Sequence, residues 1–215
     1  MPTYEQYLKE LKKSQKQLGF KHKLITVLSH KGELKIDLYG PSIFLEKIPP
    51  LIEAIVKAPY NAALFSALAV AKKPLSLIHM KDRSLLSAGA IREDLPWYKF
   101  LSVQKVREMA IYFNVEGYVK PISVECRQGN KVLSFKKRDD LKFTLVHEFF
   151  HLWNEIEPQR IPKKGYLPRY MSSPKLQSEL WATRYTNGWR YKETRCVRRL
   201  YGRMNYVVDS VSNYR

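Results

Sequence analysis

The chain has 215 residues, of which 45% are hydrophobic and 27% are charged. A chain of this length and apolar content can bury a core as one large domain or two small ones, so we do not expect disorder. Lysine and arginine number 38 against 20 acidic residues, a formal net charge of +18. This excess attracts polyanions and acidic partners, but it does not by itself specify one.

The cysteines and the N-terminus favour a cytoplasmic location. Cys126 and Cys196 are too few for a disulfide scaffold and lack the spacing of a zinc knuckle, although they could pair in a hyperthermophile. The N-terminus has no apolar core of the kind that a secretory signal carries. The uncharged run over 58–71 is shorter than a membrane span, so we expect no membrane segment.

The first half of the chain is predicted to be mainly helical, with one early β-hairpin. Apolar spacing favours an amphipathic helix over 4–18, and two alternating runs within 23–38 predict a hairpin. Residues 43–115 look mostly helical, interrupted by prolines, and His79 is expected to be an ordinary core or surface residue. We therefore define an N-terminal region, 1–116, without an assigned role.

The second half, 117–215, changes character and contains a second predicted hairpin. Two alternating runs, 122–126 and 131–135, flank the turn-forming sequence Gln-Gly-Asn. A charged link then leads into a helix whose N-cap is Asp139 or Asp140. The whole chain is thus expected to belong to the α+β class.

That helix carries the motif His-Glu-x-x-His at His147, Glu148 and His151. Positions i and i+4 of a helix share one face, so the two imidazoles can bind one tetrahedral zinc ion. Glu148 follows the first ligand, where a carboxylate can take a proton from water activated by the metal. The motif therefore predicts a hydrolytic zinc site with Glu148 as the catalytic base.

The residues around the motif are apolar nearly all round the helix, which predicts a buried element. Buried polar side chains are costly unless they have partners, so two histidines and a glutamate in such a helix need an explanation. The alternative is that both histidines are satisfied core residues and the glutamate is exposed.

A catalytic zinc ion normally has three protein ligands, and several glutamates are candidates for the third. Glu179 is our first choice, because Ser172-Ser173-Pro174 is a good start for a second helix that Gly188 would end. Glu157 stands where longer motifs place a third histidine, and Glu193 is a weaker candidate.

The segments 132–135 and 141–151 resemble the strand and active-site helix of the ImmA/IrrE-type metallopeptidases, where a strand, a basic link and an F-T-x-x-H-E-x-x-H helix recur. Residues 179–185 are similar to the later helix that supplies a glutamate in such small gluzincins. The resemblance covers about 118–190; it departs from the family at Phe150 and in the residues that follow Glu179.

The resemblance implies a small zincin-like domain, in which two ligand-bearing helices lie beneath a short twisted sheet. Its edge strand would be 131–135 or 122–126, to which an extended peptide could add by backbone hydrogen bonds. A tyrosine often assists in zincins, and Tyr166, Tyr170 and Tyr185 are all available. The implied function is zinc-dependent hydrolysis of peptide bonds, acting on a regulatory or DNA-associated protein. A separate hypothesis is a toxin or effector that acts on a host protein.

The C-terminal region supports a second hypothesis. Residues 184–215 hold eight lysines or arginines against two acids, a net of +6, interleaved with aromatic residues. Such a pattern suits nucleic-acid backbones and stacked bases, although arginines lying over packed tyrosines would produce it too. The alternative function is therefore a basic, nucleic-acid-associated binding protein with a structural or degenerate zincin core.

Overall fold

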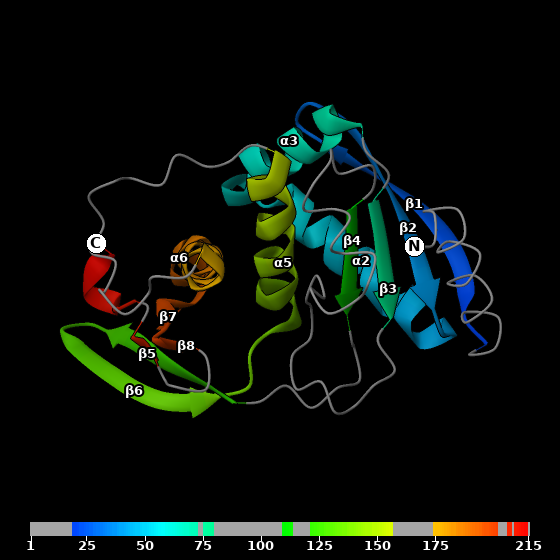
Figure 1. Cartoon of the computed structure of the whole chain (residues 1–215). Coiled ribbons are helices and arrows are strands. Elements are labelled where there is room, and N and C mark those ends of the chain that lie inside the picture. The colour runs from blue at the N-terminus through cyan, green and yellow to red at the C-terminus, as the bar shows by residue number, and fades with distance from the viewer. Residues whose placement is uncertain are drawn as a thin grey trace. The chain divides into compact units, whose positions relative to one another are not determined.

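The structure is a computed structural model that describes residues 19–72, 75–79, 109–113, 121–156, 174–201, 206–207 and 209–214 (Figure 1). The chain divides into two compact units, Met1–Tyr118 and Val119–Arg215. Both contain helices and strands, so the chain is of mixed α+β class. The helix expected over 4–18 lies outside the described residues.

The first unit begins with the predicted hairpin. Strands β1 (Lys21–Ser29) and β2 (Gly32–Gly40) pair antiparallel over their whole length, and Gly32 has the positive φ of 137° that the turn requires. Alternate residues of β2 are buried, namely Leu34, Ile36 and Leu38. This alternation is the pattern from which the sequence predicted the hairpin, and the prediction is confirmed.

The prediction of a mainly helical first half is not confirmed, because two further segments of the described residues are strands. Strands β3 (Leu75–His79) and β4 (Met109–Phe113) lie parallel to β2 and complete a sheet in the order β1-β2-β3-β4. Four of the five residues of β3 are buried. A parallel strand covered on both faces shows no alternation of polar and apolar residues, so its sequence cannot be told from a helical segment.

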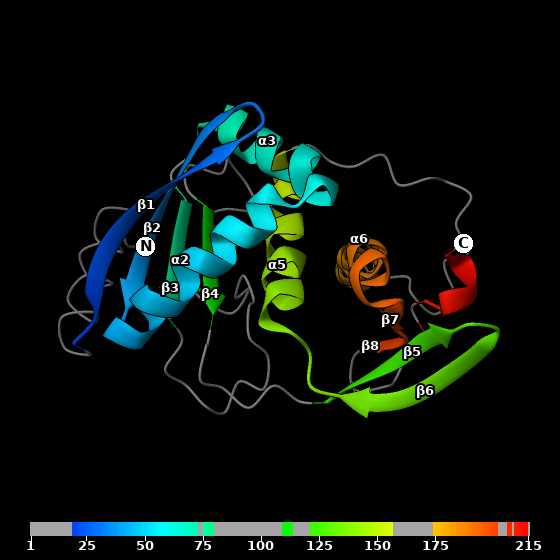
Figure 2. The same ribbon diagram turned by 180° about the vertical axis from the view of Figure 1, so that it is seen from behind.

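Helices α2 (Ser42–Lys57) and α3 (Ala62–Ala71) are joined by the short helix η1 (Pro59–Asn61), and Figure 2 shows α2 crossing one face of the sheet. Prolines 49 and 50 were expected to interrupt the helix, but α2 runs through both. Its buried residues recur every three or four positions, and their packing outweighs the two missing backbone donors. His79 is a core residue, edge-on to the rings of Phe20 and Phe44.

Within the described residues, no individual helix has the length and apolar content to cross a membrane. The bent pair formed by α2 with η1 and α3 passes that test only when both arms are taken together, at 78° to each other.

The second unit holds the second predicted hairpin, which is also confirmed. Strands β5 (Ile122–Gln128) and β6 (Lys131–Lys137) pair antiparallel, and β7 (Cys196–Arg198) joins the other side of β5. The order β6-β5-β7 makes β6 an edge strand and β5 the central one. A further pair, β8 (Leu200–Tyr201) and β9 (Tyr206–Val207), precedes the short helix η2 (Val211–Asn213).

Cys126 and Cys196 form a disulfide between β5 and β7, where they stand opposite each other in the register. Both are buried and pack with Ile122 and Val124 on one face of the sheet. Disulfides persist in oxidising compartments. The expectation of a cytoplasmic protein assumed that the two cysteines pair only if the source is a hyperthermophile.

The two long helices of this unit are α5 (Leu141–Ile156) and α6 (Pro174–Thr194). Asp140 caps α5, because its carboxylate accepts the Lys142 N–H at 3.0 Å. The expected end of α6 at Gly188 is wrong: the helix continues to Thr194 and ends at Arg195, whose φ of 57° is left-handed. Trp189, Arg190 and Tyr191, which follow Gly188, are buried, and their packing outweighs the cost of about 1 kcal/mol for a glycine within a helix.

Helices α5 and α6 cross. In Figure 1 the view is along the axis of α6, whereas α5 lies in the plane of the picture. At one end of the crossing, Arg190 of α6 makes a buried ion pair with Asp139, at 2.8 Å to both carboxylate oxygens. The same guanidinium lies over the ring of Phe143, which packs edge-on against Trp189. This cluster fixes the start of α5 against the last turns of α6.

The C-terminal segment is held to the same helix by buried polar groups. Asn187 has no exposed surface; its amide donates to the Arg198 carbonyl and to the Asp209 carboxylate, and its oxygen accepts from Arg190. Glu125, buried on β5, accepts the Val211 backbone N–H at 3.1 Å. Asp209 and Val211 are therefore part of the core of this unit.

We expect Asp139→Ala to destabilise the second unit by about 3–5 kcal/mol, because it leaves the buried Arg190 guanidinium without its counter-ion. Denaturant unfolding followed by far-ultraviolet circular dichroism measures the loss. The matched control is Glu193→Ala, which removes the partner of Lys142 from the more exposed ion pair between the same two helices and should cost less than about 1 kcal/mol. Equal losses in the two variants would contradict the assignment of Asp139 and Arg190 as the main contact.

Candidate metal centre

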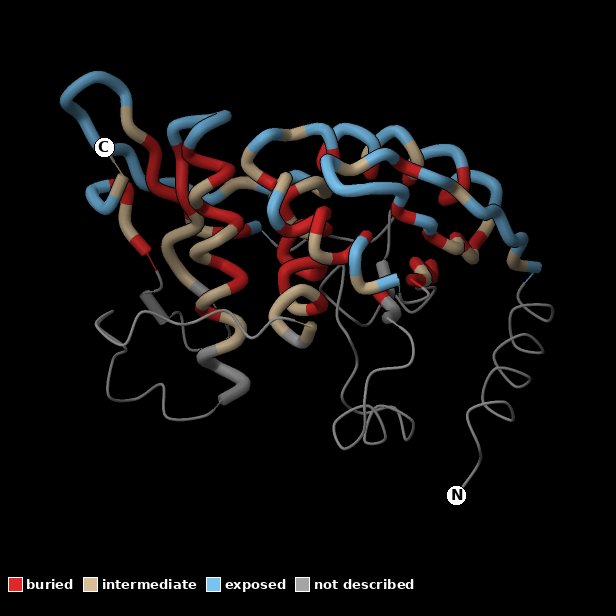
Figure 3. Tube along the Cα trace, turned by 90° about the horizontal axis from the view of Figure 1, so that it is seen from above, coloured by how far each residue is buried: buried red, intermediate tan, exposed pale blue. Residues whose placement is uncertain are grey.

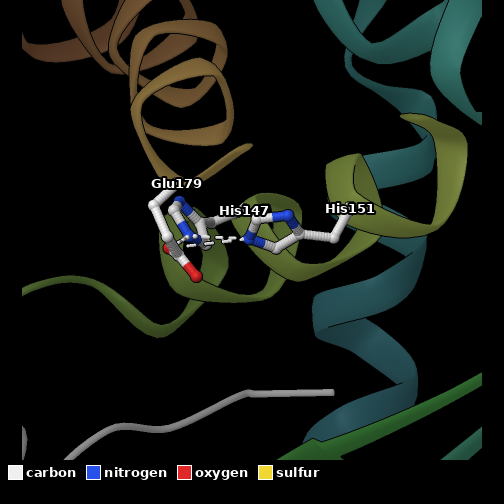
Figure 4. Close-up of side chains that lie close together, drawn as sticks. All are labelled: His147, His151 and Glu179. Atoms are coloured by element: carbon white, nitrogen blue, oxygen red, sulfur yellow. Dashed lines mark hydrogen bonds and ion pairs between the residues drawn. The ribbon is translucent and has the colours of Figure 1, made fainter. Parts of the chain in front are cut away.

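Two histidines of α5 present ring nitrogens to one point. His147 and His151 are one helical turn apart, and their Nε2 atoms lie 3.2 Å from each other (Figure 4). His147 is buried and His151 is partly buried. The i, i+4 spacing therefore places two imidazoles together on one face of the helix, as the motif predicts.

Glu179 of α6 joins the two histidines. Its Oε2 lies 3.0 Å from His147 Nε2 and 3.6 Å from His151 Nε2. One ligand atom from each residue lies within 4.8 Å of the others, and the three residues form a group that could hold a metal ion. Two imidazole nitrogens and a carboxylate oxygen form a donor set that suits zinc and leaves a fourth position for water.

Ser178 lies next to Glu179 in α6 and contacts the other side of His151. Its Oγ lies 3.0 Å from His151 Nδ1. When Nδ1 donates its proton to this hydroxyl, Nε2 carries the lone pair that a metal ion needs. Ser178 was not predicted from the sequence, because a serine one position before a glutamate acquires this role only once the two helices cross.

Glu148 is buried beside the group, with 5% of its surface exposed. Burial raises the pKa of its carboxyl to about 8, while the charges of His151 and Glu179 act on it in opposite directions. These charges act on Glu148 because it lies close to the ligand set. A carboxyl group whose pKa lies near neutrality is suited to proton transfer.

The protonation of the ligands also favours a cation. Burial lowers the pKa of His147 to about 4, so its imidazole is neutral at pH 7. Burial raises the pKa of Glu179, but the hydrogen bonds of both histidines and their charges outweigh it and leave that pKa well below its usual range. The set therefore offers a neutral imidazole at His147 and an ionised carboxylate at Glu179.

The other sequence candidates lie elsewhere or outside the described residues. Glu193 forms an ion pair with Lys142, away from the histidines. Tyr185 packs its ring against those of Phe150 and Trp153. Three further candidates lie outside the described residues: Glu157, Tyr166 and Tyr170.

The basic and aromatic C-terminal region is partly interior. Trp189, Arg190 and Tyr191 are each no more than 5% exposed, so they cannot stack on bases in this fold. Lys192 and Arg195 are exposed, so positive charge remains at the surface. The spacing of these side chains therefore reflects packing of α6 at least in part.

Comparison of the chain with family models, with curated proteins and with solved structures found no match.

We expect Ser178→Ala to weaken metal binding about 10- to 100-fold, because His151 loses the acceptor that fixes its tautomer and ring orientation. Titration of the metal-free protein with zinc, in competition with a chromophoric chelator, measures the dissociation constant. Ser123→Ala, a half-buried serine on β5, is the control and should leave it unchanged. Equal constants for wild type and Ser178→Ala would contradict the role of Ser178.

Proposed function

We propose that the protein is a zinc-dependent metallopeptidase that hydrolyses peptide bonds. The observation that carries the proposal is the convergence of His147, His151 and Glu179, from two helices, beside the buried carboxyl of Glu148. This donor set and an adjacent acid–base group form the constellation that a hydrolytic zinc site requires. The resemblance of residues 118–190 to the ImmA/IrrE-type metallopeptidases supports the same class.

In this proposal His147, His151 and Glu179 hold the zinc ion, and Ser178 orients His151. A bound zinc ion supplies a Lewis acid that activates water and polarises the carbonyl of the peptide bond. Glu148 accepts the proton of the attacking water and delivers it to the departing amine. Its burial favours this transfer, because the carboxyl is held in a water-poor environment and gives up or takes a proton near neutral pH.

The substrate in this proposal is a protein or peptide, and the resemblance favours a regulatory or DNA-associated protein. The alternative, a basic nucleic-acid-associated protein with a structural or degenerate metal core, stays a prediction. The two differ in what Glu148 does: it is essential for a peptidase, whereas salt-sensitive nucleic-acid binding is indifferent to it.

Metal content is the first test. We expect close to one zinc per chain by elemental analysis, lost in Glu179→Ala because two imidazoles alone bind zinc weakly. Glu157→Ala and Glu193→Ala are the matched controls and should retain the metal. Absence of zinc from the wild type after reconstitution would overturn the peptidase proposal, and loss with Glu157→Ala instead would reassign the third ligand.

Activity is tested with Glu148→Gln, which keeps the shape of the side chain and removes the base. We expect cleavage of an unfolded protein substrate to fall by about 100-fold or more, while zinc content and thermal stability stay near those of the wild type. Mass spectrometry of the products measures cleavage. A Glu148→Gln variant as active as the wild type would exclude Glu148 as the general base.

A further inference from the structure

Strand β6 is an edge of its sheet and is exposed along almost all of its length (Figure 3). Three of its large apolar residues remain open to solvent: Val132 is 53% exposed, Leu133 41% and Phe135 46%. Natural edge strands usually carry features that discourage pairing with another strand, whereas exposed apolar residues favour such pairing. Within the described residues, β6 pairs only with β5.

Leu133 and Phe135 continue the buried face of the sheet. They stand opposite Cys126 and Val124 of β5 in the register, and cross-strand partners share a face. On β5 this face is buried, with Val124 wholly inaccessible and Cys126 5% exposed. The apolar face is therefore closed over β5 and open over β6, where one further strand would cover it.

Positive charges bracket this open apolar pair. Lys131 and Lys137 lie two positions outside Leu133 and Phe135, and so on the same face of β6, whereas Lys136 lies on the opposite face. Residues 131–138 contain no acidic side chain, and the nearest one along the chain, Asp139, is held by Arg190. Along this face of β6, alternate positions therefore hold a cation, two apolar residues and a second cation.

We propose that β6 binds an extended protein segment in which two apolar residues at alternate positions are flanked, again at alternate positions, by acidic residues. The segment would add to β6 as an antiparallel strand, cover Leu133 and Phe135, and pair its carboxylates with Lys131 and Lys137. This inference rests on the proposed function in one respect: it identifies the bound segment as the class of substrate that the peptidase cleaves. The binding step itself needs neither the metal ion nor Glu148.

A second copy of the chain fits this surface less well. Only an antiparallel pair centred on Ser134 would cover both apolar residues of each strand. That register sets Lys131 of one copy opposite Lys137 of the other, at both ends of the pair. Like charges directly opposite each other destabilise a pair of strands, so the charges select an acidic partner.

The test uses the full chain carrying Glu148→Gln, so that bound peptide stays intact, and fluorescently labelled peptides. The matching peptide has two valines at alternate positions, with a glutamate two positions beyond each. One control peptide replaces the glutamates with lysines, and another places the valines side by side. By fluorescence anisotropy at low salt, we expect the matching peptide to bind at least about tenfold tighter than either control.

Variants on the two faces of β6 provide the matched comparison. Lys137→Glu should weaken the matching peptide and strengthen the lysine peptide, whereas Lys136→Glu, with the same change in net charge, should do neither. Leu133→Thr with Phe135→Thr should abolish binding. Equal binding of the acidic and basic peptides, no binding of any peptide, or a dimer in sedimentation that Leu133→Thr with Phe135→Thr dissolves would overturn the proposal. Zinc content decides the proposed function separately, so the two can fail independently.

Discussion

The candidate site depends on how α5 and α6 cross. One helix can bring two histidines to a point, as α5 does, but the third ligand must come from elsewhere in the chain. Glu179 stands on α6, eleven residues before Arg190, and His147 stands eight residues after Asp139. The buried ion pair of Arg190 with Asp139 therefore holds the same two segments that carry the ligands. Without a fixed crossing, the ligand set would not exist.

The contact between α5 and α6 depends on charged and amide groups whose burial costs free energy. Arg190 is 1% exposed, and burial lowers the pKa of its guanidinium while Asp139 opposes that effect. A buried ion pair adds little net stability over well-packed apolar residues, but breaking it is costly. Asn187 extends the network to the C-terminal segment. Charged and amide groups of fixed geometry allow one relative placement of the helices, whereas interchangeable apolar side chains would allow several.

The sequence was informative wherever a single element carried the pattern. Both hairpins, the helix around His147 and the start of the later helix at Pro174 were predicted from alternation, turn residues and caps. Features that depend on distant parts of the chain were not predicted. Strand β3 shows no alternation because it is buried on both faces, and the extension of α6 beyond Gly188 depends on partners far away in the chain.

The same distinction holds within the site. His147, Glu148 and His151 belong to one local motif and were assigned from spacing alone. Glu179 was a choice among three glutamates, and the structure brings it, rather than Glu193, to the histidines within the described residues. Ser178 carries no signal in the sequence, since its contact with His151 is created by the crossing of α5 and α6.

A metal ion held by His147, His151 and Glu179 would link metal binding to the stability of the second unit. His147 Nε2 lies within hydrogen-bond distance of both His151 Nε2 and Glu179 Oε2, and each of these contacts needs a proton or a metal ion between its two atoms. A metal ion held by the three residues would place positive charge beside the Glu179 carboxylate. A metal ion bound only by the folded form would shift the folding equilibrium toward that form, so part of its binding free energy would hold the two helices together. The ion pair at the start of α5 and the ligand set further along it then act on the same contact, each making the geometry that the other needs.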